Sequence, residues 1–139
     1  MNPVRFDVAH VYEAETNGVA VRVATSYLPD QSDPPRRWVW AYHIEIENRG
    51  PRTVQLMSRR WEITDGRGRV EVVEGPGVVG ETPVIRPGGA HSYISGCPLA
   101  TASGWMSGAY RMLVENGEPF EALIPTFSLD VPGAASRLN

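Results

Sequence analysis

Glycines at positions 75, 77 and 80 form the sequence feature with the clearest chemical meaning. The stretch GPGVVG at 75–80 has the glycine spacing of a dinucleotide-binding fingerprint. Glycines at this spacing let backbone N–H groups approach a phosphate, and glycines also supply the positive φ of tight β-turns. The first interpretation predicts a ligand site at Gly75, Gly77 and Gly80, and the second predicts a structural turn.

A Rossmann-type site is excluded by the residues that follow these glycines. That fold needs a helix directly after the loop and an acidic residue about 20 positions further on, which binds the ribose. Here prolines follow at 83 and 87, and no Asp or Glu occurs between Glu81 and Glu115. The loop is therefore not part of a dinucleotide-binding fold.

Three interpretations of the glycine loop remain. A β-turn is favoured, because glycine is the usual residue where φ is positive. In the second interpretation the backbone N–H groups of Gly75, Gly77 and Gly80 bind a phosphate-containing small molecule together with Arg59 or Arg60, although the proline between the first two glycines removes one donor. The third interpretation is a contact with a protein partner.

Apolar residues expected in loops support the protein contact. Val78 and Val79 lie between the glycines, and Trp105 and Met106 follow another glycine. Trp and Met are frequent interface anchors. We predict that these four residues contact a protein partner, although Trp105 and Met106 would alternatively cap one end of the fold.

Metal and cofactor sites have little support in the sequence. The candidate nitrogen and sulfur ligands are His10, His43, His91 and Cys97. Their separations do not match the short spacings of zinc sites. Glu45 and Glu47 share one strand face, where a solvated surface is favoured over weak Mg²⁺ binding. No metal ligand and no cofactor is predicted.

Nucleophilic catalysis is also unsupported. Cys97 has no basic neighbour in the sequence that would favour its thiolate, and no serine lies in a Gly-x-Ser-x-Gly motif. A phosphoanhydride hydrolase would need an acidic metal cluster, which the sequence does not suggest. No catalytic residue is predicted, and the protein is not expected to be an enzyme.

Composition indicates a single globular domain. A chain of 139 residues buries roughly two-thirds of the surface it would expose when unfolded. The net charge of −3 disfavours nucleic-acid binding, although all 13 basic residues are Arg. The N-terminus does not resemble a signal peptide, and no apolar run approaches the roughly 20 residues of a membrane span. We expect a soluble cytoplasmic protein with no membrane insertion.

Alternation of apolar and polar residues predicts the elements that position these groups. The predicted strands cover residues 4–11, 19–27, 37–47, 53–64, 69–74, 90–95, 109–115 and 120–129. A change of parity in the fourth predicts a β-bulge near 58–60. The fold class is all-β: an immunoglobulin-like or fibronectin-III-like sandwich of seven to eight antiparallel strands, in which Tyr110 is placed like a corner tyrosine.

The chain divides into three parts on this prediction. Residues 1–18 form an N-terminal strand and turn, residues 19–131 form the sandwich domain, and residues 132–139 form a flexible tail. An unpaired edge strand would leave the sandwich open to homodimer formation.

Several stretches together resemble the ApaG family. They are residues 31–34, 41–48 (AYHIEIEN), 55–65 (QLMSRRWEITD), 75–80 (GPGVVG), 95–96, 104–110 (GWMSGAY) and 124–129 (IPTFSL). The resemblance covers roughly residues 19–130 and implies a fibronectin-III-like sandwich. Where members often have Ser-Arg-His-Trp, this chain has SRRW at 58–61, which loses a candidate metal ligand but keeps a positive charge.

The family resemblance implies a binding function. Bacterial members are small proteins associated with cobalt and magnesium tolerance, and eukaryotic relatives carry the domain in F-box and polymerase-interacting proteins, where it resembles a protein-interaction module. The glycine motif of the family has been regarded as a candidate pyrophosphate site. We therefore expect a non-enzymatic module that binds a protein, with pyrophosphate, nucleotide or divalent-cation sensing through residues 75–80 as the alternative.

Overall fold

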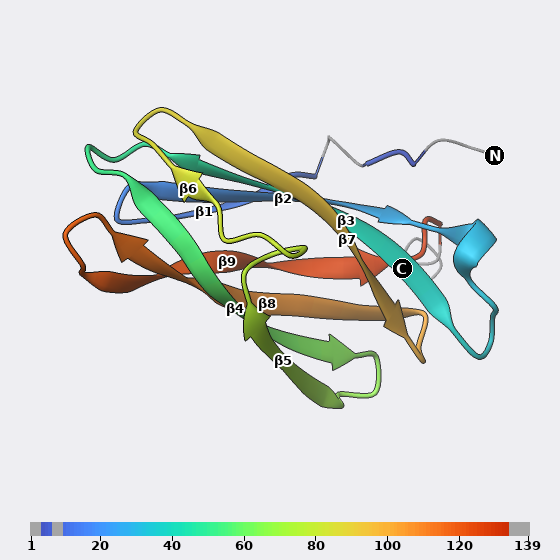
Figure 1. Ribbon diagram of the computed structural model, residues 1–139. Helices are drawn as coiled ribbons and strands as arrows, with labels where there is room; N and C mark the ends of the chain where they lie inside the picture. Colours follow the sequence, from blue (N-terminus) through green and yellow to red (C-terminus); the bar gives the residue numbers. More distant parts are fainter. Residues whose placement is uncertain (1–3, 7–9, 134–139) are drawn as a thin grey trace.

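The computed structural model describes residues 4–6 and 10–133, which form two antiparallel sheets packed face to face (Figure 1). The strands are β1 (Tyr12–Thr16), β2 (Val19–Tyr27), β3 (Trp38–Asn48), β4 (Val54–Asp65), β5 (Val70–Pro76), β6 (Val84–Ile85), β7 (Ala90–Leu99), β8 (Ser103–Val114) and β9 (Pro119–Asp130). One three-residue 3₁₀ helix, η1 (Pro29–Gln31), follows β2. The predicted β-sandwich is confirmed.

The two sheets have different strand orders. One contains β1-β2-β3-β7, and the other contains β5-β4-β8-β9, with β6 paired to β4. β7 is therefore an edge strand of the first sheet, and β5 is an edge strand of the second. Nine strands form instead of seven or eight, because two residues between the prolines at 83 and 87 pair with β4 as β6.

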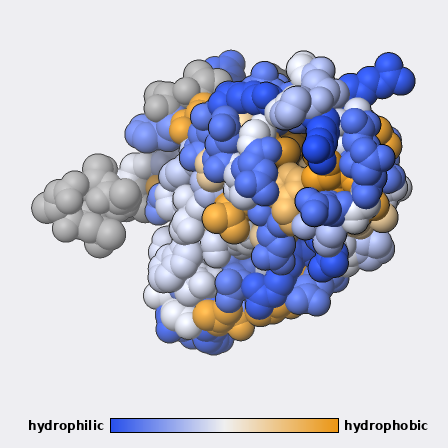
Figure 2. All heavy atoms as spheres, turned by 90° about the vertical axis from the view of Figure 1, so that its left-hand side faces the viewer, coloured by the Kyte–Doolittle hydropathy of each residue, from blue (hydrophilic) through white to orange (hydrophobic). Residues whose placement is uncertain are grey.

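Turns gather at one end of the sandwich, on the left of Figure 1, where β1 meets β2 and β8 meets β9. Figure 2 shows this end of the molecule. Hydrophilic residues cover most of the visible face, and hydrophobic residues appear there in separate groups. This end has the surface expected of solvent-exposed turns.

The alternation predicted for β3 is confirmed by its two faces. Trp40, Ile44 and Ile46 are fully buried between the sheets. The opposite face carries Glu45 and Glu47, which belong to an ion-pair network with arginines of β2 and the turn after β3. The core contains the inward side chains of both sheets.

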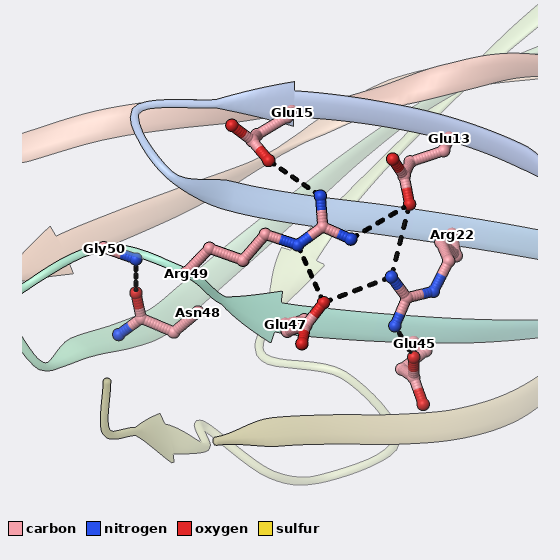
Figure 3. A network of polar contacts seen from close by, with 8 residues as sticks. All are labelled: Glu13, Glu15, Arg22, Glu45, Glu47, Asn48, Arg49 and Gly50. Carbon is pink, nitrogen blue, oxygen red and sulfur yellow. Dashed lines mark hydrogen bonds and ion pairs between the residues drawn. The ribbon is translucent and has the colours of Figure 1, made fainter. Parts of the chain in front are cut away.

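That network covers the outer face of the β1-β2-β3-β7 sheet (Figure 3). Arg22 pairs with Glu13, Glu45 and Glu47. Arg49 pairs with Glu13, Glu15 and Glu47 at 2.9–3.3 Å. Hydrogen bonds from the two arginines, that of Arg49 above all, lower the pKa of Glu47. The carboxylates considered for Mg²⁺ thus have guanidinium partners.

A β-bulge at Met57 explains the parity change in β4. Leu56 pairs with Met112 of β8, and Ser58 pairs with Arg111, so that Met57 is the additional residue. Val54 and Leu56 face the core before the bulge, and Trp61 faces it afterwards. The predicted bulge is confirmed one residue earlier than the predicted range.

Tyr110 links the two sheets. It is fully buried on β8, and its hydroxyl lies 2.5 Å from the hydroxyl of Tyr93 on β7, in the opposite sheet. The hydroxyl of a corner tyrosine bonds to the backbone a few residues earlier in the chain. The hydroxyl of Tyr110 pairs instead with a side chain across the core, so the prediction of a corner tyrosine is wrong. Burial raises the pKa of both phenols.

One prediction at the N-terminus and one in β8 need correction. The strand predicted for residues 4–11 is absent from its described residues, 4–6 and 10–11, and the first strand begins at Tyr12. Residues 7–9, and the tail beyond 133, lie outside the described residues. Trp105 and Met106, predicted in a loop, lie in β8, where Gly104 lets the strand run close to β4: a Cβ at this position would lie 2.4 Å from the Thr64 carbonyl oxygen.

Neighbouring substitutions in β8 test this placement. Met106 is 1% exposed, whereas Trp105 is 46% exposed on the opposite face. We expect Met106→Ala to lower the free energy of unfolding by about 2–4 kcal/mol, through loss of buried contacts, and Trp105→Ala to lower it by about 1 kcal/mol or less. Urea unfolding measures both, and a larger cost for Trp105→Ala would contradict the assigned strand register.

Candidate functional site

The glycine loop is a tight β-turn. The Val78 N–H donates to the Glu81 carbonyl at 2.8 Å, and the Glu81 N–H donates to the Val78 carbonyl at 3.0 Å. Val79 and Gly80 have φ of 47° and 78° between them, as in a type I′ turn. The Gly77 N–H donates to the Met57 carbonyl at 2.9 Å. Three N–H groups of the loop are thus used in backbone hydrogen bonds.

Two of the glycines allow close approach of other groups. A Cβ on Gly75 would lie 3.0 Å from the guanidinium nitrogens of Arg59, its partner across the β4–β5 ladder. A Cβ on Gly77 would lie 2.2 Å from the Glu81 carbonyl oxygen, and Gly77 has a φ of +59°. The fingerprint spacing therefore has a structural cause at both positions.

Arg59 and Arg60 lie on opposite faces of β4. Arg59 donates from Nη1 to the Pro76 carbonyl at 2.9 Å and to the Gly77 carbonyl at 3.0 Å. Arg60 lies on the outer face, within 3.2 Å of Glu74 and 3.5 Å of Glu62. The structure therefore joins Arg59 to the glycine loop and places Arg60 on the other side of the sheet.

Arg59 also lines a cavity of about 730 Å³ between the edge strands β5 and β7. One wall is formed by residues 95–100, which are the end of β7 and the residue after it. The other wall contains residues 69–71 and Val73, in and just before β5. Tyr42 and Trp61 are among the remaining lining residues, with their rings in edge contact at 5.4 Å. We call this space the β5–β7 cavity; its volume falls in the range of ligand sites.

Tyr42 and Ser95 line the inner end of the cavity together with Arg59. Burial raises the pKa of Tyr42, and a hydrogen bond with Ser95 opposes this effect. The positive charge of Arg59 acts on the hydroxyls of Tyr42, Tyr93 and Tyr110, where it favours the ionised form against burial. Among the ion pairs of residues 4–6 and 10–133, none involves Arg59. The cavity therefore has a cation whose fixed hydrogen bonds are to neutral carbonyls.

Acidic groups lie toward the outer end of the same cavity. Burial disfavours ionisation of Asp65, but hydrogen bonds from Arg69 and Arg67 outweigh it and lower the pKa of this carboxyl. The Arg69 Nε donates to Asp65 at 2.7 Å, which fixes the β4–β5 hairpin. Glu71 also lines the cavity. The carboxylates of the cavity thus lie at the hairpin end, where Arg69 pairs with Asp65, and Arg59 lies at the other end.

The predicted protein-contact residues are divided by the structure. Val78 and Met106 are each 1% exposed and belong to the core, so the prediction that they contact a partner is wrong. Val79 is 63% exposed at the turn, and Trp105 lies on the outer face of β8. Buried Val78 anchors the turn, which leaves its neighbour Val79 in solvent.

Sequence reasoning missed the inward residues of the cavity. Tyr42 and Trp61 follow the alternation of core residues, and Ser95 and Glu71 lie in short strands with no motif. Tyr42 and Trp61 lie on β3 and β4, next to the edge strands β7 and β5 that carry Ser95 and Glu71, and no local pattern in the sequence gives this order of strands.

In the described part of the chain, no three His, Cys, Asp or Glu side chains are grouped so that they could hold a metal ion. No described helix is long and apolar enough to cross a membrane.

The glycine loop gives a stability test. Gly77→Ala would place a methyl group against the Glu81 carbonyl, whereas a Cβ at Gly80 meets nothing within 4 Å. We expect Gly77→Ala to cost about 3 kcal/mol of unfolding free energy and Gly80→Ala about 1 kcal/mol, because only the positive φ opposes the second change. Thermal unfolding of the two variants measures the difference, and equal losses would contradict the close approach of Gly77 to the Glu81 carbonyl.

Cys97 gives a test of reactivity at the cavity. Burial raises the pKa of its thiol to about 12, and the charge of Glu71 contributes. Because the thiolate is the reactive form, we expect iodoacetamide to modify the folded protein at pH 8 roughly a thousandfold more slowly than the urea-unfolded chain. The native rate should rise with pH without levelling off below pH 10, as followed by mass spectrometry. A plateau near pH 9 would show an ordinary thiol.

Comparison with known proteins agrees with this fold. The ApaG domain matches residues 29–114. A protein ApaG of Rhodospirillum centenum is 55% identical over 130 residues, which are 93% of this chain and all of that protein. The crystal structure of an ApaA protein from Bordetella pertussis is 42% identical, with a TM-score of 0.81 over 95% of this chain and all of that chain.

A more distant structure shares the fold alone. The C-terminal domain of wzt is 9% identical, with a TM-score of 0.53 over 89% of this chain and 79% of that chain. Family membership rests on the two more similar proteins above, the protein ApaG and the ApaA protein, which this chain matches over their whole length. By domain match, sequence identity and structure, the chain belongs to the ApaG family.

Proposed function

We propose that this protein is a non-enzymatic binding module that holds an extended segment of a protein partner in the β5–β7 cavity. One observation carries the proposal: six consecutive residues of and after β7, 95–100, line the cavity. Consecutive residues of a strand point to opposite faces, so a continuous run exposes the edge of the backbone itself.

An exposed strand edge binds extended chains through main-chain hydrogen bonds. β7 pairs with β3 on one side and is the last strand of its sheet. A segment that adds to such an edge gains affinity from backbone groups and specificity from pockets for alternate side chains. Ile63 and Val73, which are only partly buried, supply apolar surface for such side chains.

The state of Cys97 supports a binding role over a catalytic one. Its thiol is buried and has a raised pKa, the reverse of what activates a nucleophile. On this proposal, the association with cobalt and magnesium tolerance implied by the family resemblance acts through the bound partner.

A second candidate function is the sensing of pyrophosphate or a nucleotide. It is favoured by Arg59, which has no carboxylate partner in the described part of the chain. The backbone hydrogen bonds of Gly77, Val78 and Glu81 leave fewer N–H groups for an anion than the sequence suggests. The partner-binding function therefore takes precedence.

Photo-crosslinking tests the partner-binding function. A benzoylphenylalanine at Glu71 would face the cavity, and one at the next residue, Val72, would face the opposite side of β5. We expect covalent adducts with a partner protein in living cells from position 71 and at least about tenfold fewer from position 72, because adjacent strand residues alternate between faces.

Comparison of positions 71 and 72 shows which face of β5 contacts a partner. Adducts mainly from position 72 would place the contact on the outer face, near Trp105, and would overturn the proposal. An adduct with a second copy of the chain would identify a homodimer as the occupant. The absence of adducts from both positions would count against protein binding by this region.

A further inference from the structure

We propose that the β5–β7 cavity recognises the C-terminus of its partner, with the terminal carboxylate on Arg59. This inference rests on the proposed function and adds the chemical identity of the bound segment. It depends on three features of the cavity: its charge, its direction and its closed end.

The charge selects a carboxylate. Arg59 lines the cavity. Its Nη1 donates to the carbonyls of Pro76 and Gly77 at 2.9 and 3.0 Å. These two bonds fix the guanidinium and leave Nη2 and Nε as donors. A guanidinium binds a carboxylate through two parallel N–H···O bonds, and its planar fork matches that group. The hydroxyls of Tyr42 and Ser95 line the same end.

Strand register gives the cavity a direction. The β4–β5 hairpin and residues 99–100 mark the outer end, where Asp65 and Arg69 line the opening. Ser95 and Arg59 mark the inner end. The run 95–100 spans about 17 Å at ~3.3 Å per residue, the length of about five extended residues.

The loop between β5 and β6 would close the inner end to a bound segment. Arg59 donates to the carbonyls of Pro76 and Gly77, where the loop leaves β5, and further along the loop Glu81 Oε2 lies 3.8 Å from His91 Nε2 of β7. Figure 1 shows this segment crossing the open side of the sandwich between β5 and β6. A chain entering from the hairpin end therefore meets the loop at Arg59 and has to stop there. A segment that ends in a free carboxylate satisfies both the closed end and the cation.

The test compares two peptide pools that differ only at the last group. Random-sequence hexapeptides, acetylated at the N-terminus, carry either a free C-terminal carboxylate or a carboxamide. We expect the carboxylate pool to shift the backbone amide NMR signals of residues 95–100 and the Arg59 side-chain signal, with at least about tenfold tighter apparent binding than the carboxamide pool, as a charge-assisted hydrogen bond requires.

Arg60 provides a matched control. Arg59→Gln should reduce binding of the carboxylate pool to that of the carboxamide pool, whereas Arg60→Gln, which changes the neighbouring residue on the outer face, should leave it unchanged. The pool comparison uses the wild-type protein, so it decides the inference even if Arg59→Gln does not fold.

Other outcomes separate this inference from the proposed function. Equal shifts from both pools would keep the cavity as a segment-binding site and overturn C-terminal recognition. If sodium acetate reproduces the carboxylate shifts at equal concentration, the site binds small carboxylates and the peptide inference fails. If inorganic pyrophosphate alone shifts Arg59 and residues 79–80, the anion-sensing function replaces both. Silence with both pools overturns the inference, and crosslinking at position 71 then decides the proposed function independently.

Discussion

The structure depends on an arginine turned toward the interior of a β-sandwich. The charge of Arg59 acts on the hydroxyls of three tyrosines, and its partly buried side chain needs hydrogen-bond acceptors. The carbonyls of Pro76 and Gly77 supply them. They can do so only because Gly75 has no side chain where the guanidinium passes. The loop, the end of β5 and the inner end of the cavity are positioned by this set of contacts.

The two faces of the sandwich use charge in different ways. On the outer face of the β1-β2-β3-β7 sheet, Arg22 and Arg49 have several glutamates each, and these exposed pairs contribute little individually to stability. Within the cavity, Arg59 has neutral acceptors, and the acidic groups lie at the other end. The outer face therefore carries paired charges, whereas Arg59 has no carboxylate partner among residues 4–6 and 10–133.

Alternation along the chain was sufficient to predict the sandwich, the faces of β3 and the bulge in β4. It could not distinguish a core residue from a cavity residue, because Tyr42 and Trp61 face inward in either case. Which strands lie at the sheet edges follows from topology, and no local pattern gives that order. Trp105 and Met106, predicted in a loop, lie in a strand, because Gly104 and Gly108 let β8 lie close to β4.

The two walls of the cavity differ in how firmly they are held. β7 is paired with β3 over ten residues, and Tyr93 ties it to the opposite sheet. β5 pairs only with β4, and most of its residues are exposed. Local opening of a segment costs least where few apolar groups are buried, so β5 will exchange its amide hydrogens well before β7 does. The cavity thus has one wall that two partners hold in place and one wall that opens more readily.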